Sequence, residues 1–177
     1  LGKTLSLATA AVLASLLGDG PVLILCPATL TQQWQVELWD KLGVPSAVWT
    51  KKKTWLDHTG HHILTRGPED VARCPYQIGI VSTGLVFQLG PERAHLLGRR
   101  YGTLVLDEAH RARRAGGTGK KAGEPNNLLA FMLESAKISR HILLGTGTPI
   151  QTEVSELWDL LGILGCGADH VLGRSNS

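Results

Sequence analysis

The chain is poor in cysteine and has no long apolar run. Its three cysteines, Cys26, Cys74 and Cys166, are odd in number and far apart along the 177 residues. That spacing argues against a disulfide framework and favours a reducing compartment. No apolar segment approaches the roughly 20 residues of a membrane-spanning helix, and no basic-then-apolar signal segment opens the sequence. We therefore expect no contact with a membrane.

The sequence also lacks internal repeats and a charge bias strong enough to identify a partner. Its net charge is +3, and 43% of its residues are apolar, which is typical of a single globular domain with a sizeable core. Apolar runs rich in branched residues alternate with helix-forming segments, which predicts an α/β fold with a mainly parallel sheet and helices on both faces. Strands are expected at 22–26, 44–49, 78–81, 103–106 and 141–144, and helices at 5–17, 29–42, 91–99, 128–138 and 152–165.

Part of a phosphate-binding loop stands at the start of the chain. Gly2, Lys3 and Thr4 precede a run of good helix formers. In a phosphate-binding loop the glycine lets the backbone approach a phosphate, the lysine reaches the β and γ phosphates, and the threonine hydroxyl binds Mg²⁺. The first glycine of the full motif would lie before Leu1, so we expect the amino-terminal part of the loop to lie outside this chain. A chance occurrence of the tripeptide is the alternative.

Two adjacent carboxylates follow the strand expected at 103–106. Asp107 and Glu108 end this apolar run, and Ala109 and His110 come next. Acidic groups at the end of a buried strand cost desolvation energy unless something compensates for their charge. A divalent cation would compensate for it, since ligands bind at the carboxyl ends of parallel strands. The alternative is a strand that runs into a polar loop, where both acids are solvated.

A basic segment without acids follows these carboxylates. Its positive residues are Arg111, Arg113, Arg114, Lys120 and Lys121, set among glycines and alanines that cannot build a core. This composition predicts an exposed, mobile loop, and its charge suits a polyanion. If all five side chains contacted phosphates, log K would fall with log salt at a slope of about −4.5. The three lysines at 51–53 could also touch a phosphate backbone, although such runs are more often a solvated face.

Histidines and a cysteine between residues 50 and 77 raise the possibility of a zinc site. The candidate ligands are His58, His61, His62 and Cys74. Their spacing matches no usual paired-ligand pattern, so a solvated loop is the favoured interpretation of this segment.

An apolar stripe is expected on the helix at 29–42. Leu30, Trp34, Leu38 and Leu42 recur every four residues and therefore share one face of the helix. This pattern indicates packing against a core, and packing is also the favoured interpretation of Trp39.

Four motifs in a fixed order identify the family that the chain resembles. They are GKT, CPATL, DEAH and GTGTP, and an accidental succession of all four is difficult to obtain. Together they resemble the first motor lobe of the Swi/Snf-type DNA-translocating ATPases, within the DEAD/DEAH-box helicase superfamily. VLILCPATLTQQW resembles the family's second block, and LVLDEAHRAR resembles its acidic block. TGTPIQTEVSELWDLLGIL is the most specific match, close to the family pattern TGTPIQNxxxELWxLLxFL.

The sequence departs from the family pattern at three places. IVSTGLVF lacks the Tyr and Glu of the corresponding I-x-S/T-Y-E-x-L segment, Thr152 stands where Asn is usual, and Gly145 stands where an apolar residue is usual. Related strand-separating DEAH enzymes carry S-A-T at the last block, so the residues present favour the translocase branch. The resemblance implies a RecA-like P-loop NTPase lobe at 1–165, followed by a tail at 166–177 directed toward a second lobe.

The resemblance also implies roles for particular residues, with ATP and Mg²⁺ as ligands. Lys3, in the loop that begins at Gly2, would contact the β and γ phosphates. Thr4 and Asp107 would hold Mg²⁺, and Glu108 would polarise the attacking water.

Further residues are implied in coupling and in nucleic-acid binding. His110 and the turn of Thr146, Gly147 and Thr148, with Gln151, would couple the nucleotide state to the grip on DNA. The segment from Pro27 through Thr29 to Trp34 would lie beside the tracked strand, with the basic loop nearby.

The expected partners are duplex DNA and a second RecA-like lobe in the same full-length chain. Family members need that lobe to bring arginines to the γ phosphate, so we expect these residues alone to hydrolyse negligible ATP. A degenerate lobe without turnover and an RNA-directed DEAH-box helicase are the alternatives. No histone-reading module is present, which favours a bacterial, cytoplasmic setting, or a nuclear one in a eukaryote.

Overall fold

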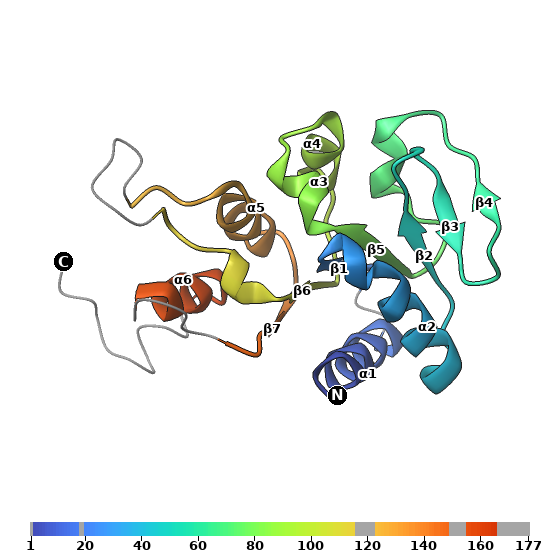
Figure 1. The fold of residues 1–177 in the computed structure, drawn as a ribbon, viewed down its shortest axis with the longest axis horizontal. Coiled ribbons are helices and arrows are strands. Elements are labelled where there is room, and N and C mark those ends of the chain that lie inside the picture. The colour runs from blue at the N-terminus through green and yellow to red at the C-terminus, as the bar shows by residue number, and fades with distance from the viewer. Residues whose placement is uncertain (1, 18–19, 116–122, 149–154, 166–177) are drawn as a thin grey trace.

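Continuous apolar runs form the centre of one seven-stranded sheet in the computed structural model, which describes residues 2–17, 20–115, 123–148 and 155–165 (Figure 1). The strands are β1 (Val22–Cys26), β2 (Ser46–Trp49), β3 (Trp55–Asp57), β4 (His62–Ile63), β5 (Ile78–Ser82), β6 (Thr103–Asp107) and β7 (His141–Gly145). Their order across the sheet is β4-β3-β2-β5-β1-β6-β7. The five strands from β2 to β7 in that order pair in parallel, and β3 and β4 add antiparallel pairs at one edge. The predicted mainly parallel sheet is confirmed.

Helices cover both faces of this sheet, because its central strands are apolar on both sides. The helices are α1 (Lys3–Leu16), α2 (Thr31–Leu42), α3 (Thr83–Phe87), α4 (Pro91–Leu97), α5 (Asn127–Ala136) and α6 (Ser155–Ile163), with short 3₁₀ turns η1 (Ala28–Leu30), η2 (Pro68–Ala72) and η3 (Ala109–Arg111). One face carries α1 and α2, and the other carries α3, α4, α5 and α6 (Figure 1).

Two buried clusters form the core, one on each face of the sheet. Successive side chains of a strand point to opposite faces, so Ile24 of β1 joins the cluster under α1 and α2, whereas Leu23 and Leu25 join the other. Trp34 and Leu38 of α2 are fully buried in the first cluster, and Leu30 and Leu42 pack against it. The stripe predicted on this helix is therefore confirmed. Gly43, in the left-handed conformation at φ 65°, ends α2.

The interpretation of residues 50–77 as a solvated loop was wrong. This segment contains β3, β4 and η2, which together with the connecting turns we call the edge hairpin. Its strands are only three and two residues long, too short to show a period of two. Trp55 is buried and its indole donates a hydrogen bond to the Asp70 carbonyl oxygen at 2.9 Å. Across the described ranges no helix has the length and apolar character needed to cross a membrane.

Candidate functional site

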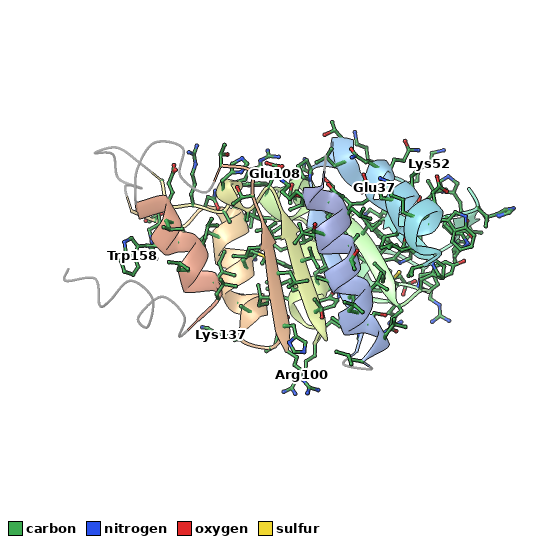
Figure 2. The ribbon with its side chains drawn as sticks, turned by 90° about the horizontal axis from the view of Figure 1, so that it is seen from below. Glu37, Lys52, Arg100, Glu108, Lys137 and Trp158 are labelled. Carbon is green, nitrogen blue, oxygen red and sulfur yellow. The ribbon has the colours of Figure 1, made fainter. Side chains whose placement is uncertain are left out.

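The carboxyl ends of four parallel strands bring the sequence motifs to one edge of the sheet. Strands β1, β5, β6 and β7 end at Cys26, Ser82, Asp107 and Gly145, and they run in the same direction. Side chains that follow these strands therefore meet at this edge. Figure 2 shows Glu108 there, at the end of the molecule opposite Arg100. We call the cluster of Lys3, Asp107, Glu108, His110 and Thr146 the strand-end site.

Asp107 is the buried centre of this site. It is only 1% exposed, so each carboxylate oxygen needs a partner. Its Oδ2 atom accepts a hydrogen bond from the indole Nε1 of Trp34 at 3.0 Å. Its Oδ1 atom accepts one from the Glu108 amide at 2.8 Å and lies 3.0 Å from the Lys3 ammonium. Two donors from distant parts of the chain, Trp34 and Lys3, and the neighbouring Glu108 amide thus hold one carboxylate in a fixed orientation.

Lys3 bridges both acids from the first residue of α1. Its ammonium pairs with the Glu108 carboxylate as well as with Asp107. Burial lowers the pKa of Lys3, but the hydrogen bonds to Glu108 and Asp107 and the charges of the two acids outweigh that effect, so the pKa is raised above its usual value. Lys3 therefore stays positively charged beside the two carboxylates.

The chemistry of these side chains fits a phosphate ester with a divalent cation. Carboxylate oxygens are the ligands that Mg²⁺ prefers, usually together with phosphates. The start of α1 has no side-chain cap at Gly2 and no acidic residue in its first turn, so its amide groups and Lys3 can face an anion. Thr4, half-buried in that turn, supplies a hydroxyl. Gly2, Lys3 and Thr4 thus lie on the same side of the sheet edge as the acids.

Glu108 adopts an uncommon backbone conformation. Its φ of 54° and ψ of 46° lie in the left-handed region, which costs energy for a residue with a side chain and is often found at functional sites. This turn directs the Glu108 carboxylate to Lys3 and, at 3.4 Å from its Oε2, to the Nδ1 of His110. One local distortion therefore links a cation on α1 to the imidazole after β6.

His110 connects the ends of β6 and β7. Its Nδ1 lies 3.0 Å from the hydroxyl of Thr146, and that hydroxyl accepts a hydrogen bond from the Thr148 amide at 3.1 Å. Gly147, between them, is exposed. The structure thus brings together His110 and the turn of residues 146–148. Gln151 lies outside the described residues.

Gly145 allows a close approach between β7 and α1. It pairs in register with Asp107, and a Cβ built there would overlap the Leu7 methyl group Cδ1. Leu7 therefore occupies the space that a larger side chain at position 145 would need. Glycine at position 145 is thus compatible with the packing of Leu7 seen here.

The basic residues after the site are partly neutralised by α6. Arg113 pairs with Glu156 at 3.2 Å, and Arg114 pairs with Asp159 at 3.1 Å through its side chain and at 2.8 Å through its amide. Arg111 is exposed, with its guanidinium 5.9 Å from the centre of the Phe87 ring. Lys120 and Lys121 lie outside the described residues. Sequence reasoning missed these acids because they lie more than 40 positions further along the chain.

The two tryptophans of α2 differ from part of what the sequence predicts. Trp34 is fully buried, as the helical stripe predicts, so it cannot touch nucleic acid in this conformation, contrary to what the family resemblance implies. Trp39, interpreted as a packing residue, is 44% exposed, and its ring centre lies 4.2 Å from that of His58. Five residues along a helix turn the side chain by about 140°, so the stripe through Trp34 leaves Trp39 outside it. Pro27 is half-buried and Thr29 is exposed at the sheet edge.

The possible zinc ligands do not gather into a site. Among the described residues no group of three or more His, Cys, Asp or Glu side chains could hold a metal ion. His61 Nδ1 and His62 Nδ1 instead lie 2.7 and 2.8 Å from the hydroxyls of Thr59 and Thr54. Burial raises the pKa of Cys74 to about 11, which leaves its thiol protonated near neutral pH.

Comparisons with known protein families and with curated proteins agree with one another. The chain matches the SNF2-related domain over residues 1–170. It is 26% identical over 143 residues to an uncharacterized ATP-dependent helicase, YqhH, of Bacillus subtilis, covering 81% of this chain and 20% of that protein. It is 30% identical to the helicase SWR1 of Saccharomyces cerevisiae over an alignment of 177 positions, which covers 93% of this chain and 10% of that protein.

A solved structure shares the fold. The Sulfolobus solfataricus SWI2/SNF2 ATPase core, determined in complex with double-stranded DNA, superposes with a TM-score of 0.66 at 20% identity, over 98% of this chain and 31% of that one. The chain thus spans about a fifth or less of the length of the two curated relatives described here.

Proposed function

This chain belongs to the SNF2-related domain family, and from that membership we propose that it is the ATP-binding lobe of a DNA-dependent ATPase that moves along duplex DNA. One observation carries the proposal. Lys3, Asp107 and Glu108, from two segments about a hundred residues apart in the sequence, converge at one sheet edge within ion-pair distance. Phosphoryl transfer needs such a combination of a phosphate-binding cation, a metal carboxylate and a group that orients water.

In this proposal each residue of the strand-end site has a separate role in binding or hydrolysing ATP. Lys3 exchanges its two carboxylate partners for the β and γ phosphates, to which its ammonium is equally suited. Asp107 and the hydroxyl of Thr4 would hold Mg²⁺, which would supply positive charge to the phosphates when bound. Glu108, released from Lys3, accepts a hydrogen bond from the attacking water and takes its proton, while the water oxygen bonds to the γ phosphorus and ADP leaves.

The link between His110 and Thr146 is proposed to couple this chemistry to DNA. His110 contacts both Glu108 and Thr146, so a change in the Glu108 carboxylate reaches the turn of residues 146–148. We propose the same role for Gln151. Pro27, Thr29 and Arg111 are proposed to face the DNA backbone, with Arg113, Arg114, Lys120 and Lys121 completing that surface.

The proposal includes a second RecA-like lobe in the full-length protein, with 1–165 as the first lobe and 166–177 leading toward the second. Hydrolysis then requires groups that this lobe does not carry, and the 177 residues alone are expected to hydrolyse negligible ATP. The proposed setting is the bacterial cytoplasm.

A comparison of nucleic acids tests this function in the full-length protein. ATP hydrolysis should be stimulated most by duplex DNA, less by single-stranded DNA and least by RNA. A larger effect of RNA would favour an RNA-directed DEAH-box helicase. Binding of DNA without any hydrolysis would favour a degenerate lobe. Either result would overturn the proposal.

A further inference from the structure

Trp34 joins the start of α2 to the central carboxylate of the strand-end site. It is fully buried, Asp107 is 1% exposed, and the indole Nε1 donates to Asp107 Oδ2 at 3.0 Å across 73 positions of sequence. A buried indole N–H needs an acceptor, and any backbone carbonyl would satisfy it. The acceptor of Trp34 is instead the Asp107 carboxylate, for which we propose a role at the strand-end site.

The other face of the same helical turn borders an open groove. Ala28, Thr31 and Gln32 line a cavity of about 640 Å³ together with residues of β2, β3 and β5 and of the segments that follow β2 and β5. Ala28, Thr29 and Gln32 are exposed. A ligand that contacts this segment therefore acts on the turn of α2 that carries Trp34 on its buried side.

Close packing makes Trp34 a rigid connection. It lies in the cluster that contains Ala8 and Ala11 of α1 and Val105 of β6, and side chains in such cores have little room to reorient. Its indole holds Oδ2 of Asp107, which leaves Oδ1 facing Lys3 and the Glu108 amide. A shift of the α2 start would thus rotate the carboxylate plane and move Oδ1.

We propose that Trp34 is a positioning residue that fixes the Asp107 carboxylate for Mg²⁺ and transmits contacts at residues 28–32 to it. This inference rests on the proposed function and deepens it. Removing the indole N–H frees Oδ2, weakens binding of Mg²⁺ with the nucleotide and reduces the response to DNA. Partners that orient metal ligands typically contribute about tenfold or more in metal affinity.

The edge hairpin offers a matched control. Trp55 is also buried, at 1% exposed, and its indole donates to the Asp70 carbonyl oxygen at 2.9 Å. Trp55→Phe therefore removes a similar volume and one indole hydrogen bond, as Trp34→Phe does, but far from the strand-end site in the sheet order. A purely structural role for Trp34 predicts the same behaviour from both variants.

The experiment compares these two variants in the full-length protein. It measures urea unfolding, the Mg²⁺ concentration that half-saturates binding of a fluorescent ADP analogue, and KM and kcat for ATP with and without duplex DNA. Trp34→Phe should raise the half-saturating Mg²⁺ concentration about tenfold and lower the DNA stimulation of kcat. Trp55→Phe should change the half-saturating Mg²⁺ concentration and the DNA stimulation of kcat by less than about twofold. Its loss of stability in urea should be similar to that of Trp34→Phe.

Equal Mg²⁺ dependence and equal DNA stimulation in the two variants would overturn the inference alone. If the unsubstituted protein binds no Mg²⁺ with nucleotide, the proposed function itself fails. Should Trp34→Phe not fold, hydrogen exchange of the unsubstituted protein provides the second measurement. Mg²⁺ with ADP should change amide exchange at residues 28–34, and unchanged exchange there would contradict the proposal.

Discussion

The strand-end site and the edge hairpin each hold a buried aspartate, but they hold it in different ways. Asp107 is bound by Lys3 and Trp34, which are distant in the sequence. Asp57 Oδ1 accepts hydrogen bonds at 2.7–2.9 Å from the Thr59 hydroxyl and from the Thr59 and His61 amides, all within four residues, and its Oδ2 has a longer contact of 3.5 Å with the Tyr76 hydroxyl. Local hydrogen bonds shape a turn, whereas convergence of distant segments on one charge creates a site. Substitutions in the two regions should therefore affect different properties.

The largest expected effect comes from Lys3→Ala in the full-length protein. Loss of the ammonium removes the proposed phosphate contact and should weaken nucleotide binding about 30-fold, or roughly 2 kcal/mol. Lys52→Ala provides the control, since Lys52 is exposed at the edge hairpin (Figure 2), and should change the affinity less than about twofold. Titration with a fluorescent nucleotide measures the affinity of both variants. Equal affinities of Lys3→Ala and Lys52→Ala would contradict the difference proposed between the strand-end site and the edge hairpin.

Gly145→Ala should have a smaller effect, on stability. The new Cβ would overlap Leu7 Cδ1, and because that atom is the end of a flexible side chain, the cost should be about 1 kcal/mol. Adding Leu7→Ala should relieve the overlap. Gly162→Ala is the control, since a Cβ there meets nothing within 4 Å. Urea unfolding would refute this account if Gly145→Ala were as stable as the parent protein.

The smallest expected effect is on the pH dependence of stability and comes from Asp57. The Thr59 hydroxyl is the main cause that lowers the pKa of Asp57 from 3.8 to about 2, opposed by burial and assisted by the His61 and Thr59 amides. A carboxyl whose pKa is lower in the folded state stabilises the fold above its unfolded pKa, and this contribution is lost as pH falls through the folded value. The stability difference between the parent and Asp57→Asn should therefore shrink mainly as pH falls from about 4 toward about 2. A constant difference would show that the charge of Asp57 contributes nothing.

The same contrast explains what could be predicted from the sequence. Strands β1, β5 and β6 are continuous apolar runs that show their length and their end, so the fold and the position of Asp107 and Glu108 followed from the residues. The edge hairpin has strands of only three and two residues, too short to show a pattern. The hydrogen bonds of its turn, such as that of Thr59, are local in sequence, but without recognisable strands on either side they did not identify a hairpin.

Contacts between distant segments were equally hidden. A helical stripe predicts that Trp34 is buried but cannot identify Asp107 as its acceptor. The pairs that Arg113 and Arg114 form with α6 were also invisible, since a charge run in sequence says nothing about acids that fold against it. The exclusion of Trp39 from the stripe could have been predicted from helix geometry alone.

Glu108→Gln in the full-length protein gives the most direct test of the proposed ATPase site. The amide keeps the size of the side chain but cannot take a proton from water, so hydrolysis should be abolished while Mg²⁺-dependent nucleotide binding stays within about threefold of the parent. The measurement is steady-state ATP turnover with duplex DNA beside equilibrium nucleotide binding. Undiminished turnover in this variant would contradict the role of Glu108 and the assignment of the strand-end site as the place of hydrolysis.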